Sequence, residues 1–125
     1  MNEILDQYKT ISIEDIKIWY QVGSVGDFPI DGGACIQYKQ KQIAVFHFGR
    51  LNKWYACQNL CPHKLEMVIS RGMIGDQKGI PKVACPLHKK TFSLEDGSNL
   101  NGEDYSIAVY PVKIEGEKVY IGFSE

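Results

Sequence analysis

Short apolar runs, separated by glycine, proline, asparagine and aspartate, occur along most of the chain. They are rich in valine, isoleucine and aromatic residues, which favour strands. Turn residues separate them at the spacing typical of a β-sandwich or barrel. The expected strands are residues 17–22, 34–39, 43–48, 54–57, 91–94, 105–114 and 119–123. The pattern therefore predicts an all-β fold, with weak helical character only at 2–8 and 12–16.

The middle of the chain, residues 58–90, departs from this pattern. It is rich in predicted loop and holds three prolines as well as glycines at 72, 75 and 79. Long irregular segments in compact domains are usually functional. Further along, Pro111 interrupts the run 105–114, which predicts an edge strand or a bend there.

Length and composition limit the class of protein. The chain has 125 residues, so we expect a single domain over residues 1–125. The net charge of −1 argues against a nucleic-acid binder, which is usually strongly basic. The N-terminal region has no apolar run typical of a signal peptide, and no stretch has the ~20 apolar residues that cross a bilayer. We expect a cytoplasmic protein that does not associate with membranes.

The charge is unevenly distributed. Residues 64–90 carry six basic side chains against two acidic ones, a net charge of +4, so the remainder carries −5. Lys64, Lys89 and Lys90 belong to this positive segment. They predict either a docking surface for an acidic partner or ordinary solvated loop lysines, and the sequence favours neither.

Two stretches of the middle segment repeat one arrangement of side chains. NLCPHKLE, residues 59–66, contains Cys61 and His63, and ACPLHKKTF, residues 84–92, contains Cys85 and His88. A proline directly follows each cysteine. Each loop can therefore give a metal site one thiolate and one imidazole, and residues 64–84 between them can bring the loops side by side.

Two metal sites fit these four side chains. A single zinc ion accepts two cysteines and two histidines, but zinc fingers usually take both cysteines from one turn and both histidines from another. Here each loop gives cysteine first and histidine second. That order favours a two-iron cluster, in which two thiolates hold one iron and two imidazoles hold the other.

The remaining cysteines and the third histidine are interpreted as structural. Cys35 and Cys57 lie in predicted strands, where cysteine behaves as a small buried hydrophobic residue. A disulfide between Cys57 and Cys61 would remove a candidate ligand and is not expected. His47 lies in the apolar run 43–48 and is interpreted as a strand residue.

The motifs CPH at 61–63 and CPLH at 85–88 resemble those of Rieske iron–sulfur domains. Residues 70–97, which include the hairpin-like piece RGMIGDQKGIPK, resemble the small subunit of assimilatory NAD(P)H-dependent nitrite reductase. Simple Rieske ferredoxins have a shorter segment between the two motifs.

The resemblance implies a Rieske-type antiparallel β-sandwich with a small inserted cluster-binding subdomain at about 57–92. It implies a [2Fe–2S] cluster with Cys61 and Cys85 on one iron and His63 and His88 on the other. The implied partner is a large subunit with FAD, a [4Fe–4S] cluster and sirohaem, which reduces nitrite to ammonium. The implied role of this chain is electron transfer or accessory, without catalytic residues or a nitrite site of its own.

The sequence leaves two other functions open. One is a free Rieske-type ferredoxin that delivers electrons to an aromatic-ring dioxygenase. The other is a non-redox assembly module whose motif binds zinc or no metal.

Overall fold

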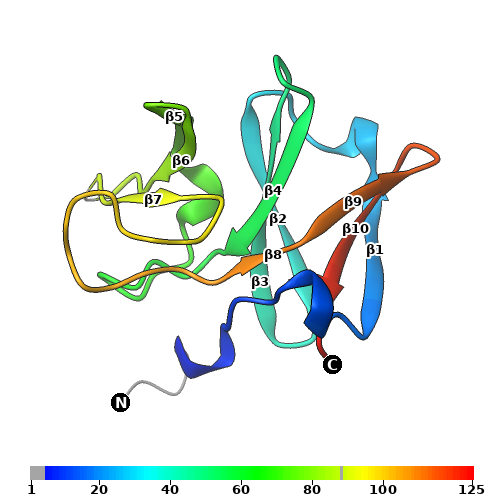
Figure 1. The fold of residues 1–125 in the computed structure, drawn as a ribbon, viewed down its shortest axis with the longest axis horizontal. Coiled ribbons are helices and arrows are strands. Elements are labelled where there is room, and N and C mark those ends of the chain that lie inside the picture. The colour runs from blue at the N-terminus through cyan, green and yellow to red at the C-terminus, as the bar shows by residue number, and fades with distance from the viewer. Residues whose placement is uncertain (1–4, 88) are drawn as a thin grey trace.

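The computed structural model describes residues 5–87 and 89–125, whose regular secondary structure consists of antiparallel strands and a few short 3₁₀ turns (Figure 1). The strands are β1 (Ile18–Ser24), β2 (Gly32–Tyr38), β3 (Lys41–Phe48), β4 (Lys53–Gln58), β5 (Met73–Gln77), β6 (Ile80–Ala84), β7 (Thr91–Ser93), β8 (Val109–Tyr110), β9 (Val112–Glu115) and β10 (Lys118–Phe123). Short 3₁₀ turns are η1 (Leu5–Gln7), η2 (Ile13–Asp15), η3 (Val25–Asp27) and η4 (Ile69–Arg71). The all-β prediction is confirmed. No helix among these residues is long and apolar enough to cross a bilayer.

The strands form three sheets. The first has the order β1-β10-β9, the second β2-β3-β4-β8, and the third β5-β6-β7. The first two sheets pack into a sandwich around a core that includes Ile43, Val45, Val119 and Ile121, all fully buried. Burial of these side chains is the main stabilising contribution to the sandwich.

The second sheet is covered on both faces. Along β3, Ile43 and Val45 face the sandwich core, whereas Ala44 and Phe46 belong to a second core. Successive side chains of a strand point to opposite faces, so a strand buried on both faces requires a continuous apolar run. This explains the sequence IAVF at 43–46.

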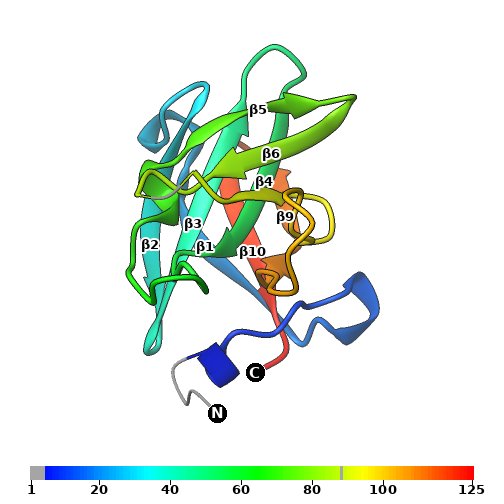
Figure 2. The same cartoon turned by 90° about the vertical axis from the view of Figure 1, so that its left-hand side faces the viewer.

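The third sheet and its loops cover the outer face of the second sheet. Figure 1 shows β5, β6 and β7 beside the sandwich, and Figure 2 shows β5 and β6 in front of β3 and β4. The approach is close at Gly33, where a Cβ atom would collide with the Ser70 carbonyl oxygen and the Phe46 ring. Glycine is therefore required at the point where η4 packs on β2.

The structure corrects some predicted boundaries. The expected strand 105–114 is wrong in extent, because Pro111 separates β8 from β9 where the chain passes from the second sheet to the first. The hairpin-like piece within 71–82 is confirmed as β5 and β6, joined by Lys78 and Gly79, both with positive φ. The weak helical segments are only the turns η1 and η2, and residues 2–4 lie outside the described residues.

Candidate metal centre

Cys61 begins a six-residue loop that two backbone hydrogen bonds close. The Cys61 N–H donates to the Glu66 carbonyl at 2.8 Å, and the Leu65 N–H donates to the Cys61 carbonyl at 2.7 Å. Leu65 has a φ of 58°, in the left-handed region that is uncommon for residues other than glycine. We call residues 61–66 the first cysteine loop.

Cys85 begins a second loop of the same construction, residues 85–90, which we call the second cysteine loop. The Cys85 N–H donates to the Lys90 carbonyl at 2.8 Å, and the Lys89 N–H donates to the Cys85 carbonyl at 2.8 Å. Lys89 has a φ of 56°, at the position equivalent to Leu65. The repeat seen in the sequence is therefore a repeat of backbone geometry, in which each cysteine is both the first residue and an anchor of its loop.

Both cysteines lie at the base of the loops, in one core. Cys61 and Cys85 are each 0% exposed and belong to the core cluster that also holds Phe92, Ile69 and Val83. Such an apolar setting keeps water away from the sulfur atoms and lowers the local dielectric. Cysteine thiolates in an environment of this kind are suitable ligands for a soft metal or an iron–sulfur cluster.

His63 is half-buried and its Nδ1 atom is buried. Its ring lies beside that of Tyr105, with ring centroids 5.6 Å apart and planes inclined by 33°. Two buried cysteines and an imidazole with a buried ring nitrogen fit a cluster with mixed cysteine and histidine ligands. His88, the fourth predicted ligand, lies outside the described residues.

The described residues do not by themselves build a site for a single metal ion. Outside the undescribed positions 1–4 and 88, no group of three or more histidine, cysteine, aspartate or glutamate side chains converges on one point.

One lysine of the second cysteine loop is held by an ion pair. The Lys90 ammonium lies 2.9 Å from the Glu103 carboxylate, and this hydrogen bond raises the pKa of Lys90 and lowers that of Glu103. Burial raises the pKa of the neighbouring Tyr105 hydroxyl, and the negative charge of Glu103 raises it further. Lys64 and Lys89, by contrast, are exposed.

The other cysteines behave differently from each other. Cys57 is fully buried in β4, as expected, and burial raises the pKa of its thiol well above the usual range. The prediction that Cys35 is buried is wrong. Cys35 lies on the edge strand β2 and is exposed, with its sulfur 3.5 Å from the Asn59 amide nitrogen. Cys57 and Cys61 are both free thiols, so the disulfide that would remove a ligand is not formed.

His47 is a strand residue, as predicted. It is 7% exposed, stacks on Trp54 with ring centroids 4.0 Å apart, and its Nε2 lies 3.2 Å from the Asn52 side-chain oxygen. Glu103 and Tyr105 were not expected near the centre. Nothing in the sequence signals their role, because they follow the second motif at no regular spacing.

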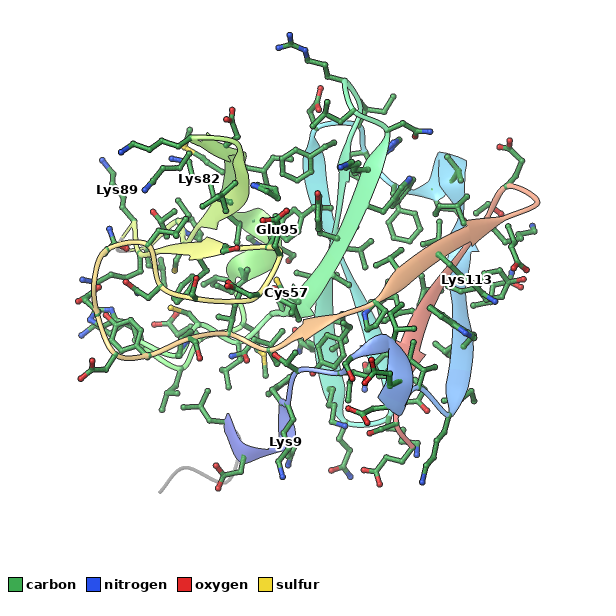
Figure 3. The ribbon with its side chains drawn as sticks, in the orientation of Figure 1. Lys9, Cys57, Lys82, Lys89, Glu95 and Lys113 are labelled. Carbon is green, nitrogen blue, oxygen red and sulfur yellow. The ribbon has the colours of Figure 1, made fainter. Side chains whose placement is uncertain are left out.

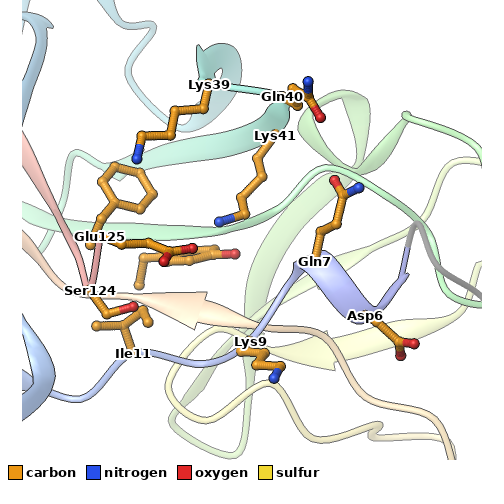
Figure 4. Close-up of a pocket in the computed structure, with 11 residues that line it drawn as sticks. Asp6, Gln7, Lys9, Ile11, Lys39, Gln40, Lys41, Ser124 and Glu125 are labelled. Carbon is orange, nitrogen blue, oxygen red and sulfur yellow. The ribbon is translucent and has the colours of Figure 1, made fainter.

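Among the cavities that border the described part of the chain, two can be placed relative to the candidate ligands. One, of about 530 Å³, lies between η1, the β2–β3 turn and the C-terminal residues, where Lys39 and Lys41 extend toward Ser124 and Glu125 (Figure 4). It contains none of the candidate ligands. The other, of about 290 Å³, is lined by Pro62 and Tyr105 and so borders the first cysteine loop.

Comparison with known proteins identifies the family. The family model described as Rieske-like [2Fe-2S] domain matches residues 18–122. The chain is 36% identical over 104 residues to the NAD(P)H nitrite reductase large subunit of Klebsiella oxytoca, covering 83% of this chain but only 11% of that protein. The NMR structure of the NAD(P)H nitrite reductase small subunit from Erwinia carotovora has 33% identity and a TM-score of 0.73, covering 86% of this chain and 82% of that one.

A ferredoxin is also similar. The ferredoxin component of the naphthalene 1,2-dioxygenase system of Pseudomonas aeruginosa is 28% identical over 107 residues, covering 85% of this chain and 96% of that protein. The similarity to the nitrite reductase proteins is higher, and the match to the family model extends from β1 into β10. The chain belongs to the family of Rieske-like [2Fe–2S] domains.

Proposed function

We propose that this chain is the small subunit of an NAD(P)H-dependent nitrite reductase and carries a [2Fe–2S] cluster in an electron-transfer or accessory role. Cys61 and Cys85 would hold one iron, and His63 and His88 the other. The observation that carries the proposal is the pair of equivalent cysteine loops with their buried cysteines in one core. The proposed cluster-binding subdomain is about residues 57–92.

A cluster with this ligand set supplies one-electron transfer, at a potential raised by its histidines. The chain's own residues determine its surroundings. The apolar core around Cys61 and Cys85 excludes water. In each loop, the two backbone hydrogen bonds that close it fix the backbone at the cysteine. Lys64 and Lys89 place positive charge on the exposed surface of both loops.

The proposed partner is a large subunit that holds FAD, a [4Fe–4S] cluster and sirohaem and reduces nitrite to ammonium. In the Klebsiella protein, a segment similar to this chain forms a small part of a much longer polypeptide, while the Erwinia relative is a small subunit. A domain joined to a reductase in one protein and separate in another supports a functional contact between the two. The cytoplasmic location stays a prediction.

The positive surface near the loops supports docking of an acidic partner face. Figure 3 shows Lys82 and Lys89 at the end of the molecule that holds the third sheet, whereas Lys9 and Lys113 project elsewhere. Lys90 is paired with Glu103, so the docking proposal rests on Lys64 and Lys89. Charges at the rim of an interface mainly steer association.

The cluster is tested first on anaerobically purified, dithionite-reduced protein. We expect two irons and two sulfides per chain, and a rhombic electron paramagnetic resonance (EPR) signal of mixed histidine and cysteine ligation. One equivalent of zinc and no EPR signal would refute the cluster. It would leave the chain as a non-redox partner of the reductase.

The partner is tested with the separately purified large subunit. We expect Lys64→Glu with Lys89→Glu to weaken association at low salt, and Lys9→Glu, the matched control, to leave it unchanged. Docking at the loops would be refuted if the wild type, the double variant and Lys9→Glu all bound the large subunit equally well.

The second candidate is a free ferredoxin for an aromatic-ring dioxygenase, which the naphthalene dioxygenase ferredoxin favours. Reduction of a dioxygenase terminal component by this chain, without any association with the nitrite reductase subunit, would establish it instead.

A further inference from the structure

The two cysteine loops are joined by a third segment of the chain. Residues 99–103 fold back on the start of β7, directly after the second cysteine loop. The Leu100 N–H donates to the Thr91 carbonyl at 2.8 Å, and the Thr91 N–H donates to the Asn101 side-chain oxygen at 2.7 Å. The side-chain oxygen of Asn99 accepts from the Glu103 N–H at 3.0 Å. The backbone of Glu103 is thus fixed relative to β7.

Glu103 and Tyr105 then contact different loops. Glu103 binds the Lys90 ammonium at 2.9 Å, and Lys90 is the residue whose carbonyl closes the second cysteine loop. Tyr105 lies against His63 of the first cysteine loop, and its ring centroid is 6.4 Å from that of Phe92 in β7. The segment therefore bridges the two loops across the candidate centre.

The Tyr105 ring also contacts the core of the candidate centre. It is partly buried and packs against the cluster that holds Cys61, Cys85 and Phe92. The ring therefore lies between the His63 imidazole of the first cysteine loop and the core in which both cysteines are buried.

We infer that Tyr105, placed by the Lys90–Glu103 ion pair, is a positioning residue that fixes the orientation of the His63 imidazole in the metal centre. The inference rests on the proposed cluster. Groups that orient a metal-binding histidine influence metal affinity and the electronic properties of the metal. The bridge makes that orientation depend on the second cysteine loop as well as on the first.

The experiment uses the full chain, with anaerobic cluster assembly, in four variants. Tyr105→Leu removes the ring contact, Tyr105→Phe keeps it without the hydroxyl, and Glu103→Gln removes the ion pair but not the side-chain shape. Glu115→Gln is the matched control, because it breaks the Lys113–Glu115 pair of β9, 3.4 Å long and outside the bridge. The readouts are the EPR g-values of the reduced cluster and the rate at which a chelator removes iron.

For Tyr105→Leu we expect shifted g-values and roughly 10-fold faster loss of iron, the lower end of the effect of outer partners on metal affinity. Glu103→Gln should change the g-values and the rate of iron loss in the same direction as Tyr105→Leu but by a smaller amount, because it leaves the core side chains unchanged. Tyr105→Phe should have g-values close to those of the wild type. Glu115→Gln should have the g-values and the rate of iron loss of the wild type. Wild-type g-values and a wild-type rate of iron loss in Tyr105→Leu would overturn the inference.

The His63 ring signals in the NMR spectrum of the metal-free protein test the contact without the cluster. We expect Tyr105→Leu to shift the His63 ring protons, because they lose the ring current of the tyrosine, and unchanged shifts would overturn the inference. If the wild type binds no iron, the proposed function fails and the inference with it. If the wild type binds iron and Tyr105→Leu behaves like it, only the inference fails.

Discussion

Cys61 and Cys85 occupy the same position in two loops that are closed by the same pair of backbone hydrogen bonds, although they follow strands of different sheets. In each loop, the residue four positions after the cysteine adopts a positive φ. The equivalence extends to burial, since both cysteines are inaccessible to solvent. It indicates that the two cysteines have equivalent roles, whereas each histidine occupies a different position in its loop.

Replacing either cysteine should therefore have the same effect. We expect Cys61→Ser and Cys85→Ser each to reduce bound iron and sulfide to background, because one iron loses a thiolate. Serine places a more polar group than cysteine in the apolar core at both positions, so the metal-free variants should be somewhat less stable but folded. Iron and sulfide assays, together with urea unfolding of the metal-free proteins, measure both effects.

The exposed Cys35 provides the control for these substitutions. Cys35→Ser should keep the wild-type iron content, since Cys35 lies on the edge strand β2 and is exposed. Full iron content in Cys61→Ser or Cys85→Ser would contradict the ligand assignment.

The packing of the third sheet on the second depends on Gly33. A methyl group at this position would collide with the Ser70 carbonyl oxygen and the Phe46 ring, so either η4 or the core must move. We expect Gly33→Ala to destabilise the chain by about 1–3 kcal/mol, the usual cost of overpacking. Urea unfolding with far-UV circular dichroism measures the change.

Gly26→Ala is the matched control for Gly33→Ala. No atom lies within 4 Å of a Cβ built at Gly26, so this substitution should change the stability by less than about 0.5 kcal/mol. Equal stabilities of the two variants would show that η4 does not approach β2 as closely as described.

Much of the sandwich could be predicted from local pattern. The run IAVFHF at 43–48 is apolar at consecutive positions and lies within β3, because its two faces contact two different cores. By contrast, the exposure of Cys35 depends on β2 being an edge strand, which is a property of sheet order and not of the residues around Cys35. The split of 105–114 at Pro111 likewise depends on two sheets sharing one segment.

The cysteine and histidine motifs could be found in the sequence because their spacing is local. The contacts of Glu103 with Lys90 and of Tyr105 with His63, which connect the two cysteine loops, could not be predicted. Lys90, Glu103 and Tyr105 are ordinary residues in the sequence, and only the fold-back of residues 99–103 onto Thr91 brings Glu103 to Lys90 and Tyr105 to His63. Contacts between loops of this kind follow from tertiary structure, for which a single sequence carries no periodic signal.

Stability in acid should depend on Asp96. Its side-chain oxygen accepts the Ser98 N–H at 2.9 Å, and this hydrogen bond lowers the pKa of the Asp96 carboxyl. A carboxyl with a lowered folded-state pKa contributes stability above its unfolded pKa of about 4, which is lost as the pH falls through the lower folded value. We expect Asp96→Asn to flatten the decline of the free energy of unfolding below about pH 4, as measured by urea unfolding at several pH values.

Asp104→Asn, at an exposed position of the same connecting segment, is the control for Asp96→Asn. It should leave the decline in acid unchanged. If Asp96→Asn reproduces the full wild-type decline, the turn at 96–98 does not hold its carboxylate in the way described.

The reactivity of Cys35 and Cys57 should differ widely in the metal-free protein. Cys35 is exposed, whereas Cys57 is fully buried in β4 and its thiol pKa is raised by burial, so at neutral pH it is neither accessible nor ionised. In a protein with Cys61 and Cys85 replaced by serine, we expect an iodoacetamide reagent to label Cys35 faster than Cys57, although partial burial raises the pKa of the Cys35 thiol as well. Cys57 should be labelled only at the rate of global unfolding, because no local opening of a central strand exposes it. Mass spectrometry of timed samples measures both rates, and urea near the unfolding midpoint should make them similar. Equal labelling of Cys57 and Cys35 in buffer would contradict the burial of β4 between the two cores.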